Sequence, residues 1–377
     1  MSTNKVISTG SVSCDPAVVP QARKISSTEE VAITCFENEV PSFIGPELER
    51  LYASLYASLP FFQVYGDMKN VSTYIARRGN EISSVLLFSL ENGKVRVLNE
   101  MIGVDEKEII PFANYIFENF PSARQIVFQA VATRAAKLPL SIQRSYYTDD
   151  IVLELPATEE EYVANLGKST RKNIKHHLSR SKRTFPSFQH QVHVAEDANE
   201  EDIRTIVEFN KLRMAGKNRI SSLDDQETER IIKLVKLCGF ISVIKIEGRI
   251  CAGAIYFRVA DHYFTLVNAH DPEYDDFRLG TLCCYLTILE CIRRNGRQFH
   301  FLWGRYEYKF ALLGVCRKLE QISIYRSSLH VMLDARNVFK KGFASRAQLV
   351  KFWLLEERRK NNFRGKTLAR LLRHMRH

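Results

Sequence analysis

The chain has 377 residues, of which 45% are hydrophobic and 26% charged, and its formal net charge is +11 at pH 7. This length is enough for about two domains with buried cores, and the composition is that of a globular protein. No run of about 18 apolar residues is present, which excludes a membrane-spanning helix, and residues 1–30 lack the apolar stretch of a secretory signal. We therefore expect a cytoplasmic protein.

Residues 1–30 contain few aromatic side chains and little periodicity, so we expect them to be disordered. Residues 31–155 are predicted to form a first lobe. Its strands are separated by Gly79-Asn80 and Asn92-Gly93, which favour tight turns. The predicted elements, in chain order, are a helix over 46–59, strands over 71–78, 81–90 and 95–100, a helix over 105–120, a strand over 125–131, and a strand over 151–155 that closes the lobe.

Residues 156–187 are predicted to form a basic helical linker. The stretch from Lys168 to Arg183 holds seven Lys or Arg residues and no acid. A run of this kind is typical of a solvated helix face, an anionic surface or a nucleic-acid contact.

Residues 188–330 repeat the element order of the first lobe, without sequence identity between the two. The predicted elements are helices over 198–214 and 226–237, strands over 241–246, 249–259 and 262–269, a helix over 279–295, a strand over 298–303, and one or two final strands over 315–325. The chain is thus predicted to be an α/β protein of the α+β type. Each of its two lobes would be a mixed, mainly antiparallel sheet flanked by helices.

Residues 331–377 are predicted to form a basic amphipathic helical tail. Thirteen Lys or Arg residues follow Asp334. We expect either a solvated helix or a peripheral contact with an anionic membrane, and nucleic acid is the less favoured partner.

The start of the helix at 279 is a candidate phosphate site. Free backbone N–H groups in a first helical turn bind pyrophosphate, and Gly280 would let the ligand approach closely. An ordinary loop is the alternative. The predicted coenzyme-binding residues are Arg278, Leu279, Gly280 and Thr281, together with Val267 and Ala269 on the preceding strand, whose open edge would bind an extended arm.

The eight cysteines form no CxxC pair and no cysteine–histidine spacing typical of a metal site, so we expect no metal. Cys283 and Cys284 lie at the same helix start, and we interpret them as packing residues.

Several motifs resemble the GNAT-fold acyltransferases of the CelD type, found with bacterial cellulose and exopolysaccharide biosynthesis, which are relatives of the Fem peptidyltransferases. The motifs are Asp271-Pro272-Glu273-Tyr274, Arg278-Leu279-Gly280, Phe301, Gly304 and Tyr308-Lys309. The resemblance covers about residues 150–315. It implies two GNAT-like lobes, acetyl-CoA or another acyl-CoA as co-substrate, and an amine acceptor on a small molecule, sugar nucleotide or glycan.

The sequence departs from the family pattern at two places. His300 and Arg305 stand where the family commonly has acidic residues. The candidates for a general base are then Asp271, which we prefer, Glu307 and His300.

Direct acyl transfer needs an oxyanion donor and an acid for the leaving thiolate. We expect Lys309 to serve as the donor and Tyr308 as the acid, and Arg213 and His300 to contact the acceptor. Each has a structural alternative: packing for Tyr308, solvation for Lys309, a surface salt bridge for Arg213 and a turn for Asp271.

Two other functions remain open. A Fem-like transferase would take an aminoacyl group from tRNA, which the positive charge would suit, although no coiled-coil arm or RNA module is evident. The second alternative is a binding protein that kept the fold without catalysis, which the altered positions 300 and 305 favour.

Overall fold

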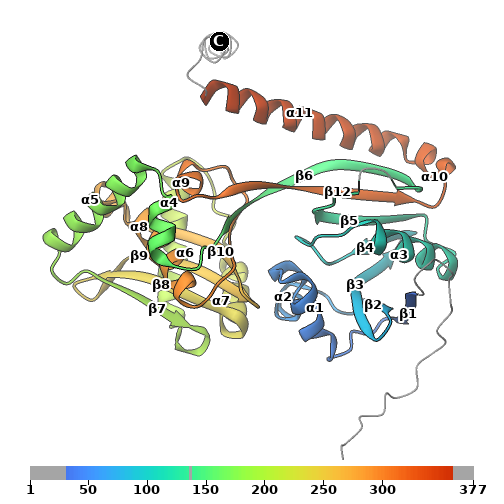
Figure 1. Ribbon diagram of the computed structural model, residues 1–377, viewed down its shortest axis with the longest axis horizontal. Coiled ribbons are helices and arrows are strands. Elements are labelled where there is room, and N and C mark those ends of the chain that lie inside the picture. Colours follow the sequence, from blue (N-terminus) through green and yellow to red (C-terminus); the bar gives the residue numbers. More distant parts are fainter. Residues whose placement is uncertain (1–30, 136–137, 360–377) are drawn as a thin grey trace, which may run out of the picture.

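The computed structural model describes residues 31–135 and 138–359, which form one mixed sheet of twelve strands flanked by helices (Figure 1). The strand order is β1-β2-β3-β4-β5-β12-β6-β11-β10-β9-β8-β7. Only β4–β5 and β10–β11 pair in parallel, and the other neighbours are antiparallel. The predicted α/β class is therefore confirmed. The expected disorder of residues 1–30 and the last residues of the tail, 360–377, lie outside the described residues.

The first lobe holds a core between its sheet and α3. Asp105 and Glu108 form a capping box at the start of α3, where the predicted helix begins. The predicted helix over 46–59 is instead interrupted at Ala53, which adopts a left-handed conformation with φ of 43°. The elements are β1 Val31–Phe36, α1 Ile44–Tyr52, η1 Leu55–Ala57, α2 Leu59–Tyr65, β2 Ser72–Arg78, β3 Glu81–Glu91, β4 Lys94–Val97, α3 Glu106–Asn119 and β5 Gln125–Val131.

Two long strands, β6 Ser141–Glu154 and β12 Val315–Tyr325, connect the two lobes. They pair with one another from Ser141↔Tyr325 to Val152↔Val315. The end of β6 pairs with β11 of the second lobe, and the end of β12 pairs with β5 of the first. The prediction that residues 151–155 close the first lobe is therefore wrong. Each lobe is completed by a strand from the other half of the sequence.

The second lobe has helices on both faces of its sheet. Helices α6 and α7 cover one face, and α8, with α4 and α5 beside it, covers the other. The elements are α4 Glu159–Asn165, α5 Lys168–Thr184, β7 Gln189–Val194, η2 Ala195–Asp197, α6 Glu200–Ala215, α7 Asp225–Cys238, β8 Gly239–Ile246, β9 Arg249–Val259, β10 His262–His270, η3 Pro272–Phe277, α8 Leu279–Arg293, β11 Gln298–Leu302 and α9 Glu307–Ala311.

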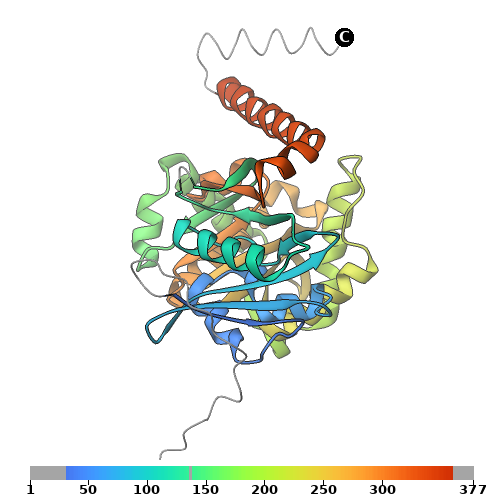
Figure 2. The same cartoon turned by 90° about the vertical axis from the view of Figure 1, so that its right-hand side faces the viewer.

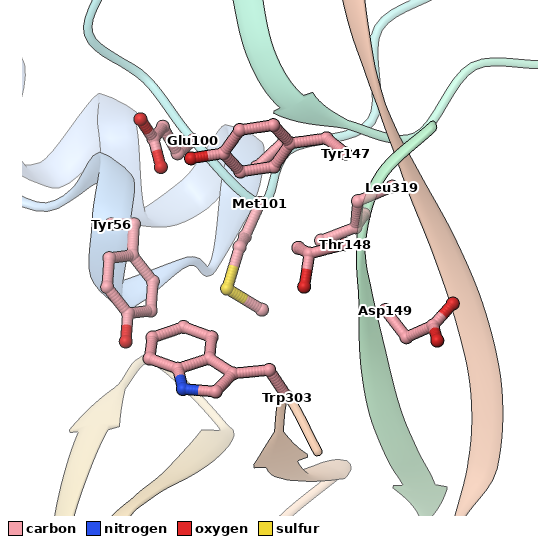
Figure 3. Close-up of a pocket in the computed structure, with 9 residues that line it drawn as sticks. Tyr56, Glu100, Met101, Tyr147, Thr148, Asp149, Trp303 and Leu319 are labelled. Atoms are coloured by element: carbon pink, nitrogen blue, oxygen red, sulfur yellow. The ribbon is translucent and has the colours of Figure 1, made fainter. Parts of the chain in front are cut away.

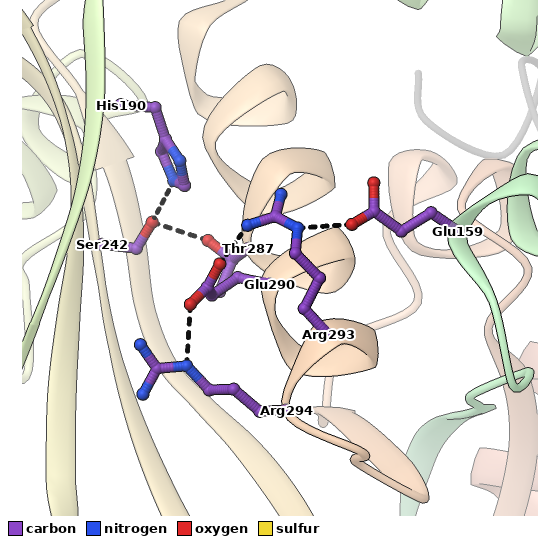
Figure 4. A network of polar contacts seen from close by, with 7 residues as sticks. All are labelled: Glu159, His190, Ser242, Thr287, Glu290, Arg293 and Arg294. Atoms are coloured by element: carbon purple, nitrogen blue, oxygen red, sulfur yellow. Dashed lines mark hydrogen bonds and ion pairs between the residues drawn. The ribbon is translucent and has the colours of Figure 1, made fainter.

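A polar network holds the C-terminal half of α8 in place (Figure 4). The Thr287 hydroxyl donates to the Ser242 hydroxyl on β8 at 2.7 Å, and Ser242 lies 2.8 Å from His190 Nε2 on β7. Burial lowers the pKa of His190 to about 4, so its ring stays neutral at pH 7. Arg293 joins α8 to Glu159 of α4. Because α8 is fixed at this end, the position of its first turn is also defined.

The chain continues into α10 Ser328–Leu333 and α11 Ala335–Arg359. Helix α11 runs along β6 at the periphery of the molecule (Figures 1 and 2). Within the described part of the chain, no helix is long and apolar enough to cross a bilayer.

Candidate functional site

The parallel strands β10 and β11 separate beyond a short paired region. Their pairing comprises His262↔Gln298, Tyr263↔Phe299 and Phe264↔His300. Beyond Phe264, β10 has an irregularity between Thr265 and Val267 and continues to His270. The strands therefore leave an open strand edge, which can hydrogen-bond to an extended ligand.

Three buried polar atoms without partners lie next to this opening. Among the described residues, Thr265 Oγ1, Asn268 Oδ1 and Arg213 Nε are buried and accept or donate no hydrogen bond. A buried polar atom without a partner costs free energy unless a ligand or water pairs with it. The opening between β10 and β11 is thus a candidate ligand site.

Two predicted site residues, Tyr308 and Arg213, come together here. Burial raises the pKa of the Tyr308 hydroxyl, the nearby Cys284 raises it further, and Arg213 and Asn268 oppose the shift. These contacts place α9, α6 and β10 around one phenol. Asn268 also donates to the Gly280 carbonyl at 3.2 Å, which connects Tyr308 to the start of α8.

Basic groups surround the first turn of α8. Arg278 is exposed and adopts a left-handed conformation with φ of 56°. Helix α5, the predicted linker, packs against η3 and α8, and its Arg180 lies over the Phe277 ring at 4.5 Å. Burial lowers the pKa of His177, and the neighbouring His176, Arg278 and Arg180 lower it further. The helix start thus combines a positive dipole end with clustered cations, an arrangement that suits a bound anion.

Gly280 has a packing role in addition to its predicted contact with phosphate. A Cβ at this position would lie 2.9 Å from His270 Nδ1 and 3.6 Å from Asn268 Oδ1. The glycine therefore lets α8 approach β10. His270 is held by Asp275, with its Nε2 2.7 Å from the carboxylate.

Lys309 is not the mobile ammonium that the sequence predicted. Its side chain is buried, and its Nζ donates to the carbonyls of Phe301 at 2.7 Å, Leu302 at 3.3 Å and Trp303 at 2.6 Å. Burial lowers the pKa of Lys309 to about 8, while Cys284 and Asp150 oppose the shift. All three ammonium protons are directed at the end of β11. The expected solvation is wrong as well, because Lys309 is 4% exposed.

The remaining predicted residues are distributed around the opening. Asp271 accepts the Glu273 amide at 3.0 Å and opens η3, as its turn alternative predicted. Glu307 is exposed at the start of α9. Val267 and Ala269 have buried side chains, so a coenzyme could reach them only through their main chain.

The two departures from the family pattern each face an aspartate of β6. His300 Nδ1 lies 2.7 Å from Asp150, and the Arg305 Nε donates to Asp149 at 2.7 Å. His300 stacks on Phe264 at 4.3 Å, at the last residue pair before the strands separate. Its Nε2 is buried without a partner among the described residues. A carboxylate on Nδ1 leaves Nε2 as the acceptor, which is the geometry of an oriented base.

A cavity of about 490 Å³ lies between the lobes, beside the Arg305–Asp149 pair (Figure 3). Trp303, at the end of β11, is 51% exposed and lies 5.8 Å from the Tyr56 ring of η1. Glu100 and Tyr147 lie close together at the other side of the cavity, and Met101 lies between them and Trp303. The other lining residues are Ala130, Thr148, Asp149 and Leu319.

Two carboxylates line this cavity, and Glu100 is the one that forms no ion pair with an Arg of the described residues. Burial raises the pKa of Glu100 to about 7, and the positive charge of Arg96 opposes this shift. Asp149, by contrast, is bound by Arg305 and points away from Trp303. Glu100, Tyr56 and Asp150 are not among the site residues that the sequence predicted. The available signal for Asp150 was the pair of acidic residues Asp149-Asp150, which directly precedes the apolar run that begins at Ile151.

No group of three or more His, Cys, Asp or Glu side chains suited to a metal ion occurs among residues 31–135 and 138–359. Cys283 and Cys284 are buried, and burial raises the pKa of the Cys283 thiol to about 12. Both therefore behave as packing residues.

Comparisons with known proteins support the GNAT resemblance. Residues 168–310 match the family described as an acetyltransferase (GNAT) domain. No curated protein matches the chain. The crystal structure of FemX is similar with a TM-score of 0.57 and 9% identity, over 78% of this chain and 98% of that chain. A conserved protein of unknown function from Bacteroides thetaiotaomicron has a TM-score of 0.51 and 11% identity, over 77% of this chain and 99% of that one. At these identities the likeness is one of fold.

Proposed function

We propose that the protein is a GNAT-type N-acyltransferase that transfers an acetyl or acyl group from acyl-CoA to an amine. The observation that carries this proposal is the opening between β10 and β11, with Tyr308, Asn268 and Arg213 beside it and the basic start of α8 next to it. In keeping with the CelD resemblance, the acceptor is an amine on a sugar nucleotide or glycan, used in the cytoplasm for polysaccharide or cell-envelope biosynthesis.

The donor would bind along this opening. The diphosphate takes the first turn of α8, where Arg278 and Arg180 supply positive charge. The pantetheine arm adds to the free edge of β10 by main-chain hydrogen bonds, near Val267 and Ala269. The thioester then lies near Tyr308.

The reaction forms a C–N bond and breaks the C–S bond. The amine nitrogen attacks the thioester carbonyl, its proton passes to a base, and the thiolate takes a proton from an acid. His300, oriented by Asp150, suits the base better than Asp271, whose carboxylate caps η3. The Tyr308 hydroxyl is protonated at pH 7, because its pKa lies above the ordinary value of 10.0, and it can therefore donate to the departing sulfur.

The cavity between the lobes would take the acceptor. An indole face and a carboxylate are the groups that attract an ammonium, and Trp303 and Glu100 supply both in a protein whose net charge is +11. Trp303 is joined to the donor side because its carbonyl binds Lys309, the neighbour of Tyr308.

The test measures thiol release from acetyl-CoA with a panel of amines, together with thermal unfolding. Acetyl-CoA at about 100 times its Kd should add about 2.7 kcal/mol of stability. Tyr308→Phe should lower thiol release by roughly tenfold or more and keep this stabilisation. Tyr306→Phe is the matched control, because Tyr306 is exposed and stacks on Tyr308 at 6.4 Å.

Three outcomes would contradict the proposal. If acetyl-CoA neither stabilises the protein nor releases thiol while aminoacyl-tRNA stabilises it, the donor is an aminoacyl group on tRNA. If neither ligand acts, the protein binds something else without catalysis. If Tyr308→Phe and Tyr306→Phe both behave as the wild type, Tyr308 is not the acid.

A further inference from the structure

Exposed apolar side chains are concentrated on the two C-terminal helices. Six of the fifteen exposed large hydrophobic residues of the described chain lie in α10 and α11. On α11, Phe339 and Phe343 are each 78% exposed, and Val350 is also exposed. Spacings of four and seven residues place these three on one helix face. Leu329, Met332 and Leu333 add exposed apolar surface on α10. We call these six residues the apolar stripe.

A different face of α11 attaches the helix to the protein. Gln143 donates to the Val338 carbonyl at 2.7 Å, and the Tyr146 amide donates to the Ser345 hydroxyl at 2.8 Å. Phe352 packs on the Tyr146 ring at 5.6 Å. Val338, Ser345 and Phe352 recur every seven residues, so this face lies on β6 and leaves the apolar stripe uncovered.

Along α11, the charges beside the apolar stripe are positive as far as Leu355, and Asp334, which precedes the helix, accepts a hydrogen bond from the Tyr325 hydroxyl. From Ala335 to Leu355 the sequence contains five Lys or Arg residues and no Asp or Glu. Arg336, Lys340 and Arg346 are exposed on the same helix. Both views of the molecule place α11 at the periphery, where the helix can meet a flat surface (Figures 1 and 2).

We propose that the apolar stripe and its flanking basic residues bind the surface of an anionic lipid bilayer. Phenylalanine rings enter the boundary between headgroups and acyl chains, and each Lys or Arg near the surface contributes about 1 kcal/mol. The charge pattern identifies the partner. A second copy of this chain has a net charge of +11 and would repel the basic residues that flank the apolar stripe, whereas an anionic lipid surface attracts them. The enzyme would then work at the inner face of the membrane.

The experiment uses the full chain in vesicle co-sedimentation. Vesicles of phosphatidylglycerol and phosphatidylcholine are compared with vesicles of phosphatidylcholine alone. We expect binding to the first kind only, weakened by salt because the charges are exposed. Phe339→Ser/Phe343→Ser should weaken binding by roughly tenfold or more, and Arg336→Gln/Lys340→Gln/Arg346→Gln should do the same. Ile220→Ser, at a 96% exposed apolar residue of the other lobe, is the control and should bind as the wild type.

The result can overturn the proposal in three ways. Equal binding to both kinds of vesicle, or to neither, would exclude an anionic bilayer as the partner. Undiminished binding by the folded Phe339→Ser/Phe343→Ser variant, with its circular dichroism unchanged, would exclude the apolar stripe. A wild-type dimer that this variant converts to a monomer would instead show that the stripe joins two copies of the chain.

Discussion

Lys309→Met should destabilise the fold, because Lys309 is a structural lysine. Its ammonium donates hydrogen bonds to three carbonyls at the end of β11. Those of Phe301 and Leu302 belong to buried residues, and a buried acceptor left unpaired costs about 1–3 kcal/mol. Water can replace the ammonium at Trp303, which is half exposed. Removing the buried charge returns part of its desolvation cost. We expect a net loss of about 2–4 kcal/mol.

The assay is denaturant unfolding at pH 7, with the loss given by the shift in midpoint at constant slope. Lys236→Met is the matched control. Lys236 also donates to two backbone carbonyls, at 2.9 and 3.3 Å, but its side chain is 26% exposed, so we expect a loss below about 1 kcal/mol. If Lys309→Met unfolds at the wild-type midpoint and has lost all turnover, the ammonium acts on the substrate and the structural role is wrong.

Two further predictions concern Glu100 and Gly280. The pKa of Glu100 is about 7 in the folded protein, above its ordinary 4.5, so the stability of the wild type falls as pH rises through that interval. Glu100→Gln should therefore raise the free energy of unfolding by roughly 1–3 kcal/mol at pH 8 and leave it unchanged at pH 4.5, as measured by urea titration. The exposed Glu118→Gln is the control. Equal gains at both pH values would contradict the raised pKa of Glu100. Gly280→Val should weaken coenzyme A binding in calorimetry by roughly tenfold, because its side chain would collide with His270. An unchanged Kd would move the phosphate site elsewhere.

The sequence predicts the interior of the fold better than its edges. Periodicity located α3, α6, α7 and α8, and with them the strands β8, β9 and β10. The two strands that were missed, β1 and β7, are the first and last of the sheet. β7 has the sequence QHQVHV, whose polar residues suit an exposed edge and carry little hydrophobic alternation. The long pairing of β6 with β12 was also missed, because such a pairing joins residues far apart in the sequence.

The same limit applies to the site. Tyr308 could be predicted because it belongs to a local motif, and the fold brings it and the expected acceptor contact Arg213 together beside the strand opening. The role of Lys309 could not be predicted from its sequence neighbours, because it depends on α9 folding back so that the Lys309 ammonium reaches the carbonyls at the end of β11. Glu100 and Tyr56 come from the first lobe, and they join the cavity only when the lobes pack together.

The pairs His300–Asp150 and Arg305–Asp149 show what the long strand adds to the chemistry. Taken alone, a histidine and an arginine at positions where the family commonly has acids suggest a lost active site. Because β6 crosses into the second lobe beside β11, it carries two carboxylates to the same two positions. Each acid and its partner are therefore supplied by different segments of the chain. If this exchange preserves a base, Asp150→Asn should lower thiol release while the stabilisation by coenzyme A persists. Loss of both together would instead mean that the pair only holds the lobes in place.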